Sequence, residues 1–443
     1  MHHIRGHLRH VRFAALVATA GLVASACAFS ADSEQVSVAS VEEPIIAGVA
    51  ANGAKLNAIG SIGYVYVDPY TETSYYSPYC SGSLIGKQTV LTAKHCLQFF
   101  ASDYNYGLKT VFAVGPNAAA PERLIEVVEV QGAPGDAGGF VGFGHDVGVM
   151  YLAEKVTDLT PVKLGTLRPQ DLGKKFIEIG YGVRDNAYNY GTRRTGNATL
   201  RATSGKVFEI IFGSFERFKS WFQTGSPGAE ALYETGPVGP AAFLPIARSL
   251  YEAPRIDVGV GGAGGETSEP PSGGKGGSSP AGGAGPVPEG GSDGGGYDPD
   301  EYLRFIYDNT LLDTGYEAVI GGAEGDAQAC YGDSGSPVIR ADSNGNLVAY
   351  GVISGGIGSS QLICDYGGVD AVFGPDVLTF LQTAKQWVDP CKGASVAGKC
   401  SGKVAQRCTS PLEGPRRLVK FNCGSLGQVC AIQPDGTAGC SDP

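Results

Sequence analysis

The chain has 443 residues, of which 42% are hydrophobic and 17% are charged. It is therefore long enough for roughly two to four domains and apolar enough to bury a core. Its net charge is −11, and it falls to −14 without residues 1–27, which hold three arginines and no acid. A chain this acidic has no electrostatic attraction for nucleic acid or anionic lipid, so both partner classes are excluded.

The first 27 residues have the features of a secretory signal peptide. Basic residues over 1–12 precede an apolar run over 13–23, and small residues then lead to Cys27. The run is too short to span a membrane. Cys27 stands where bacterial lipoproteins carry a lipidated cysteine, and two outcomes stay open: a lipid anchor at Cys27, or ordinary cleavage next to it. Both predict a secreted or cell-envelope protein.

Ten of the eleven cysteines are expected to form disulfides, because an exported chain folds in an oxidising compartment, and the odd one is Cys27. Six of them crowd into residues 391–440, a stretch too short to fold on an apolar core alone. The sequence therefore predicts a cysteine-rich module at 391–443. Zinc is disfavoured there because the stretch has no histidine, and spacing alone leaves the cysteine pairing open.

Composition divides the rest of the chain. Residues 28–44 are polar and acidic, which predicts a linker or propeptide. Short β-type runs over 45–256 predict an all-β barrel or sandwich. Within an insertion at about 203–300, the Gly-rich segment 259–296 has no large apolar side chains and is predicted to be disordered. A C-terminal helix is predicted over 376–388.

One stripe of apolar side chains inside the insertion recurs at helical spacing. Its members are Phe208, Ile211, Phe215, Phe218 and Phe222. Such a stripe favours packing against the body of the protein over binding of a ligand.

Three short motifs carry residues suited to nucleophilic catalysis: His95 lies in TAKHC, Asp146 in HDVGV and Ser334 in GDSGSP. A serine hydroxyl becomes a good nucleophile when an imidazole takes its proton, and a buried carboxylate fixes the tautomer of that imidazole. We therefore expect Ser334 to attack, His95 to act as base and then acid, and Asp146 to orient His95. His145 is expected to be structural.

In this order, the three motifs resemble those of chymotrypsin-like (trypsin-fold) serine peptidases, of a bacterial secreted type with a C-terminal cysteine-rich module. The resemblance covers about 45–388 except the insertion. It implies an all-β fold of two six-stranded antiparallel barrels with a C-terminal helix, and a protease domain at 45–390. The implied activity is a serine endopeptidase that acts on protein or peptide substrates through an acyl-enzyme, without cofactor or metal.

A competing hypothesis is a protease-like extracellular protein, weakly active or inactive, that serves in binding or adhesion. The complete set of motif residues favours the enzyme, whereas the insertion and the cysteine-rich module are not needed for hydrolysis and keep the alternative open. The sequence does not indicate an oligomeric state.

The resemblance also implies how the site is assembled and activated. The backbone N–H groups of Gly332 and Ser334 would form the oxyanion hole. Ile45 would become the N-terminus of the mature enzyme, and its α-amino group would pair with Asp333. Pro44 makes an unusual cleavage junction. Two disulfides are implied, Cys80–Cys96 and Cys330–Cys364, and Gly180-Tyr181-Gly182 resembles a Gly-Trp-Gly turn of the family.

The same resemblance places the residues that bind substrate. Ser354, Gly355 and Gly356 would bind the substrate backbone as a strand, although Gly355 replaces the usual aromatic residue. Gln328 stands where the floor of the primary pocket is expected and is neutral, and Gly356 and Gly368 would leave the pocket walls open. The prediction is an open, uncharged pocket for an uncharged side chain, such as a large apolar one.

Overall fold

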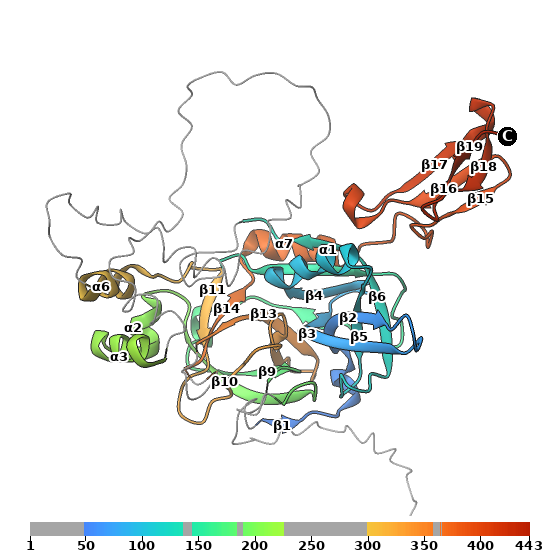
Figure 1. Ribbon diagram of the computed structural model, residues 1–443. Coiled ribbons are helices and arrows are strands. Elements are labelled where there is room, and N and C mark those ends of the chain that lie inside the picture. Colours follow the sequence, from blue (N-terminus) through green and yellow to red (C-terminus); the bar gives the residue numbers. More distant parts are fainter. Residues whose placement is uncertain (1–47, 136–143, 184–188, 226–298, 358–363, 365) are drawn as a thin grey trace, which may run out of the picture. The chain divides into compact units, whose positions relative to one another are not determined.

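The computed structural model describes residues 48–135, 144–183, 189–225, 299–357, 364 and 366–443 (Figure 1). The predicted signal peptide with Cys27, the linker 28–44, Ile45 and the Gly-rich segment 259–296 lie outside these residues. All of the described residues belong to one compact unit, Val38–Pro443. None of the helices among them is long and apolar enough to cross a membrane.

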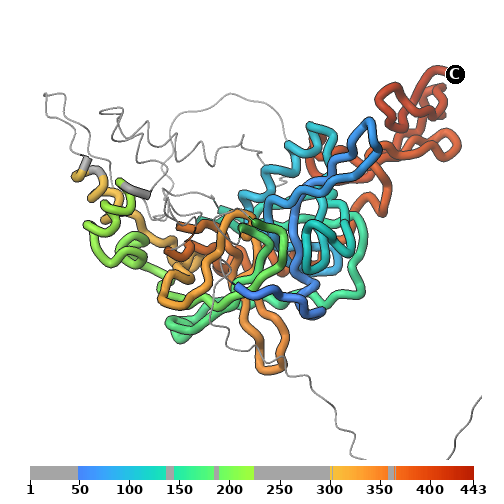
Figure 2. The backbone as a smooth tube through the Cα atoms, turned by 60° about the horizontal axis from the view of Figure 1, so that its bottom comes forward, coloured from blue at the N-terminus to red at the C-terminus, as the bar shows by residue number. Residues whose placement is uncertain are grey.

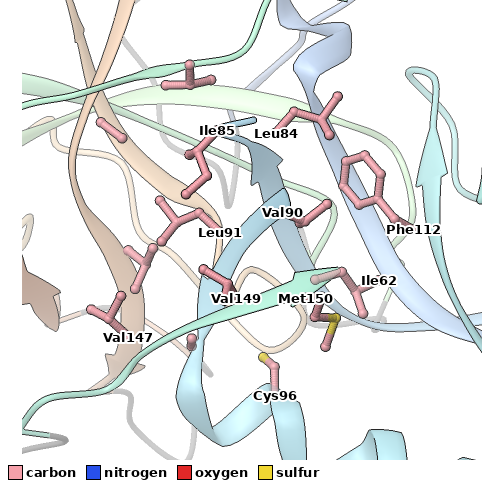
Figure 3. Packing of buried hydrophobic residues seen from close by; sticks show 14 of the residues in the cluster. Ile62, Leu84, Ile85, Val90, Leu91, Cys96, Phe112, Val147, Val149 and Met150 are labelled. Carbon is pink, nitrogen blue, oxygen red and sulfur yellow. The ribbon is translucent and has the colours of Figure 1, made fainter. Parts of the chain in front are cut away.

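The first barrel closes from six antiparallel strands in the order β2-β3-β4-β7-β6-β5. Their bounds are β2 Ile59–Val67, β3 Ser74–Leu84, β4 Thr89–Ala93, β5 Lys109–Val114, β6 Arg123–Gly132 and β7 Val147–Leu152. Every residue of β4 and β7 is buried, and β-branched side chains such as Val90 and Val149 suit this pleated, enclosed surface. Figure 3 shows part of the core that they form with Ile62, Leu84, Phe112 and Met150.

The second ring runs β10-β11-β14-β13-β12-β9 and closes because β9 also pairs with β10. Its strands are β9 Lys175–Gly180, β10 Arg194–Ala202, β11 Glu317–Ile320, β12 Pro337–Ala341, β13 Leu347–Gly356 and β14 Gly368–Val372. The short strands β1 (Val49–Ala50) and β8 (Lys163–Leu164) pair with β10 and β13. The predicted two-barrel all-β fold is confirmed, and ring closure leaves few exposed strand edges.

The described ends of the insertion form a helical cluster that packs on the second ring, with Val319 of β11 and Val369 of β14 in its buried core (Figure 1, Figure 2). It consists of α2 Val207–Phe212, α3 Phe215–Gly225 and α6 Pro299–Asn309. The predicted aromatic stripe packs here, with Phe208 and Phe218 buried against Leu303. The stripe is divided between two helices because Gly213, with φ +76°, adopts the left-handed conformation that ends α2.

Further helices complete the body of the protein. They are η1 Ala54–Ala58, η2 Lys94–Leu97, α1 Gln98–Asn105, η3 Pro169–Asp171 and α7 Pro375–Ala384. The predicted C-terminal helix is present as α7 but ends four residues before position 388. Beyond it, the Trp387 ring stacks on Tyr151 of β7, with 4.6 Å between ring centroids.

The cysteine-rich module contains two small antiparallel sheets. One joins β15 Lys399–Ser401, β16 Val404–Cys408 and β17 Leu418–Asn422, and the other joins β18 Val429–Ile432 and β19 Ala438–Ser441; η4 Pro411–Glu413 and η5 Cys423–Leu426 lie between strands. Three disulfides link its cysteines: Cys391–Cys408, Cys400–Cys430 and Cys423–Cys440. The buried cluster is small, with Ala405, Cys423 and Ala438 at its centre, so the disulfides supply stability that so small a core lacks.

Candidate active site

Neighbouring strands of the first barrel bring His95 and Asp146 together. His95 lies in η2, two residues after β4, and Asp146 immediately precedes β7, which pairs with β4 through Ala93 and Val147. His95 Nδ1 lies 2.8 Å from Asp146 Oδ2, and the backbone N–H of His95 donates to Asp146 Oδ1 at 2.8 Å. The Asp146 side chain is fully buried, whereas the His95 side chain is 21% exposed. The carboxylate therefore holds the imidazole with Nδ1 as donor and leaves Nε2 for another partner.

Hydrogen bonds join the turn that carries Ser334 to the first barrel. The backbone N–H of Ser81 in β3 donates to the Ser334 carbonyl at 2.8 Å, and Ser81 Oγ donates to the Gly332 carbonyl at 2.8 Å. Gly335 has φ +82°, and a Cβ there would overlap Thr92 Oγ1 and the Ser81 carbonyl. Glycine is required at this position because two barrels meet there without room for a side chain.

The Cys80–Cys96 disulfide lies beside these contacts, and its pairing agrees with the implied one. It joins β3 to η2, the element that carries His95. The Cys330–Cys364 pairing also agrees. It holds the segment before Ser334 to the chain that follows β13.

Ser354 adds a third hydrogen bond to Asp146. Its Oγ donates to Asp146 Oδ2 at 2.5 Å, so the acid accepts bonds from both barrels. His145 lies elsewhere, as expected: its ring stacks on Tyr316 at 3.6 Å between centroids, and its Nδ1 lies 2.7 Å from the Pro134 carbonyl. Of the two histidines after position 27, His95 is the one that contacts the buried acid.

The electrostatics of His95 suit a general base. Burial of the imidazole lowers its pKa, but the negative charge of Asp146 and the hydrogen bond to Asp146 raise it more, so that the pKa of His95 lies above 6.5. The charged imidazole formed when a proton is accepted is thus stabilised by Asp146.

Two backbone N–H groups beside Ser334 are available to a developing oxyanion. Within the described ranges, neither the Gly332 nor the Ser334 N–H has a hydrogen-bond partner. Gly332 has φ +94°, which a residue with a side chain rarely adopts. Unpaired donors at this turn can stabilise negative charge on an oxygen bound next to Ser334 Oγ.

Asp333, between these two residues, points into the protein. Its side chain is fully buried, and its carboxylate accepts the N–H of Gly182 at 2.7 Å and of Cys330 at 2.9 Å. Burial raises the pKa of Asp333 to about 7, against the lowering effect of the two N–H groups. A Cβ on Gly180 would overlap Asp333 Oδ1, which explains the glycine in the Gly-Tyr-Gly turn.

The residues expected to bind substrate also converge. Gly355 and Gly356 at the end of β13 pair with Val369 and Gly368 of β14. Gln328 Oε1 accepts the N–H of Gly367 at 2.8 Å, which places the Gln328 side chain beside the start of β14. The expected floor residue and the two glycine walls therefore lie around one region.

A groove lined in part by Gly332 was not predicted from the sequence. Its volume is about 210 Å³, and its lining residues are Pro78, Tyr79, Tyr181, Gly182, Val183, Tyr190, Tyr331 and Gly332. Tyr331 and Tyr190 are 65% and 60% exposed. The position of Tyr79 and Tyr331 directly before motif residues Cys80 and Gly332 was the available signal, because side chains flanking a catalytic turn can reach substrate.

A family model matches part of the chain. Residues 59–207 match the family model described as Trypsin. The matched segment contains the first barrel, His95, Asp146 and strands β9 and β10, and it ends before Ser334. No curated protein matches the chain significantly. The match supports a serine protease-like function for a chain with this fold.

Proposed function

We propose that this protein is a secreted or surface-anchored serine endopeptidase that hydrolyses peptide bonds through Ser334, His95 and Asp146. The observation that carries the proposal is the buried Asp146 carboxylate, which accepts hydrogen bonds from His95 and Ser354 beside the turn that holds Ser334. In this proposal residues 1–27 direct export, 28–44 are a propeptide, 45–390 form the protease domain and 391–443 are an accessory module.

The proposed reaction has two halves. His95 Nε2 takes the proton of Ser334 Oγ as this oxygen attacks the substrate carbonyl, and the new oxyanion accepts the N–H groups of Gly332 and Ser334. His95 then gives the proton to the leaving amine, and an acyl-enzyme remains on Ser334. A water molecule, deprotonated by His95, attacks the acyl group and releases Ser334 with its proton restored.

Labelling with a fluorophosphonate probe tests this proposal directly, because such probes react with an activated serine. We expect the processed protein to be labelled at Ser334, as located by peptide mass spectrometry, and the Ser334→Ala variant to remain unlabelled. A processed, folded protein that takes up no label would reject the enzyme and favour the protease-like binding protein.

The buried acid next to the nucleophile predicts how stability of the unprocessed chain depends on pH. Asp333 has a pKa of about 7 in the folded chain and an ordinary value of 3.8, so the folded form binds more protons between these pH values. The free energy of unfolding should therefore fall as pH rises from about 4 to about 7, by about 1.4 kcal/mol per unit of pKa difference.

Urea unfolding of the unprocessed Ser334→Ala chain at a series of pH values measures this effect without self-cleavage. Adding Asp333→Asn should make the decline between pH 4 and 7 less steep, because the amide does not titrate while other buried acids still do. Equal slopes for the two chains would contradict the assigned environment of Asp333.

A further inference from the structure

Two carboxyl groups point into the interior of the second barrel. Glu178 in β9 shares a strand face with buried Phe176, and Asp370 in β14 lies opposite Ala318 of β11. Because side chains alternate along a strand, both acids project to the same side as these core residues. Glu178 is 2% exposed and Asp370 is 1% exposed.

Both acids lie beside segments that the proposed function assigns to substrate binding. The backbone N–H of Ala329, the residue after Gln328, lies close enough to the Glu178 carboxylate to lower its pKa against the effect of burial. The backbone N–H of Ser354, the first of the three residues expected to bind the substrate backbone, lies close enough to the Asp370 carboxylate to lower its pKa against the effect of burial. A Cβ on Gly368 would lie 3.6 Å from Asp370 Oδ1, so this oxygen stands just behind a glycine wall of the pocket.

If Glu178 and Asp370 were both ionised, their negative charge would exceed the positive charge around them. Burial, together with repulsion from Asp370, Asp333 and Asp326, raises the pKa of Glu178 well above its ordinary value, and burial raises the pKa of Asp370 to about 8. Glu178 Oε2 and Asp370 Oδ2 are buried without a hydrogen-bond partner. In the part of the chain that the structure describes, no Lys or Arg forms an ion pair with either acid. Two buried oxygens without partners indicate that a cationic or donor group belongs there.

Gln328 does not decide the charge of this region. It is neutral, and its Oε1 is already occupied by the N–H of Gly367. A calcium ion would need six to eight oxygen ligands, and the two unpaired oxygens fall short of that number. A substrate side chain that ends in an ammonium or guanidinium group needs only a few acceptors at the bottom of an open pocket.

We infer that Glu178 and Asp370 form the charged floor of the primary specificity pocket and select Lys or Arg at the residue before the cleaved bond. This inference rests on the proposed function and replaces the uncharged preference expected from Gln328 alone. The substrate cation supplies the missing counter-charge, so that both acids can ionise beside it. Gly356 and Gly368, the expected pocket walls, have no side chain that would cover the pair.

Matched peptide substrates test the inference on the processed full-length enzyme. Arg is compared with citrulline, its uncharged isostere, and Lys with norleucine, at the residue before the cleaved bond. We expect kcat/KM for Arg and Lys to exceed the values for their uncharged partners by at least about tenfold. In Asp370→Asn and Glu178→Gln, the ratio within each variant should fall toward one. The ratio does not depend on how much of a variant is folded.

Asp158→Asn is the matched control, because it removes one exposed carboxyl that pairs with Arg123 on the surface. Its ratio should equal that of the unmodified enzyme. A preference of the unmodified enzyme for citrulline or norleucine, or unchanged ratios in both acid variants, would overturn the inference. Fluorophosphonate labelling of the same samples separates the two proposals: labelled enzyme without a basic preference rejects only the inference, whereas unlabelled enzyme rejects the proposed function.

Discussion

Replacing Ser334 or His95 with alanine is expected to lower kcat for peptide hydrolysis by about 10⁶-fold, because either change removes a group that must act together with the other. Neither residue is part of the buried apolar core, so thermal unfolding should stay cooperative. The measurement is steady-state hydrolysis of a peptide substrate by processed enzyme, with circular dichroism to follow unfolding.

His145→Ala is the control for the histidine variant. His145 is adjacent to Asp146 in sequence, but its ring stacks on Tyr316 and does not contact the buried acid. We expect His145→Ala to hydrolyse peptide with a kcat similar to that of the unmodified enzyme. If His145→Ala were as inactive as His95→Ala, or if Ser334→Ala kept its activity, the assignment of the three residues would be wrong.

The Asp146→Asn variant extends the same prediction to pH. We expect it to lower kcat by about 10⁴-fold through the wrong imidazole tautomer. His95 accepts a proton only when it is neutral, so activity of the unmodified enzyme should rise with pH through the pKa of His95, above 6.5. Without the charge of Asp146, this rise should move to lower pH. An unchanged midpoint would show that Asp146 does not set the pKa of His95.

The sequence predicted the parts of the fold and the site that depend on local order. The β-type run predicted at Thr89–Thr92 corresponds to β4, which extends one residue farther, and the glycines around Ser334 lie in a turn with an unusual backbone conformation. Such signals are local because strand propensity and positive φ are properties of a few consecutive residues. They do not require knowledge of which strands pair.

What the sequence did not reveal depends on contacts between distant strands. The pairing of Cys400 with Cys430 follows from the adjacency of β15 and β18, which spacing does not encode. Glu178 and Asp370 lie in stretches whose local sequence does not show which face of the strand is buried. Closure of the ring turns both side chains to the interior of the second barrel. The sequence shows a glycine at position 213, but a glycine alone does not show that a helix ends there.

Cleavage of the chain before Ile45 is expected to raise kcat/KM by at least about 10²-fold, the effect of gaining one ordered oxyanion donor. Asp333 is the physical reason. Its carboxylate is fully buried, its described partners are two neutral N–H groups, and it lies between the two residues that would supply the oxyanion hole. A new α-ammonium group inserted beside it would ionise Asp333 and hold the turn from Gly332 to Ser334 in one conformation.

A one-residue change at the N-terminus provides the sharpest test. A chain processed to begin with an added alanine before Ile45 carries the same ammonium one residue farther from Asp333, so it should stay as inactive as the unprocessed chain. Asp333→Asn in correctly processed enzyme should lose activity to a similar extent.

Activity of the correctly processed enzyme should also decline at alkaline pH, when the α-ammonium group loses its proton. The ion pair with Asp333 favours the charged form of this group, so its pKa should lie above the ordinary value of about 8. N-terminal sequencing identifies each form, and kcat/KM compares them. Full activity in a chain that retains residues 28–44 would show that Asp333 is stabilised without an N-terminal partner and that the site is assembled before any cleavage.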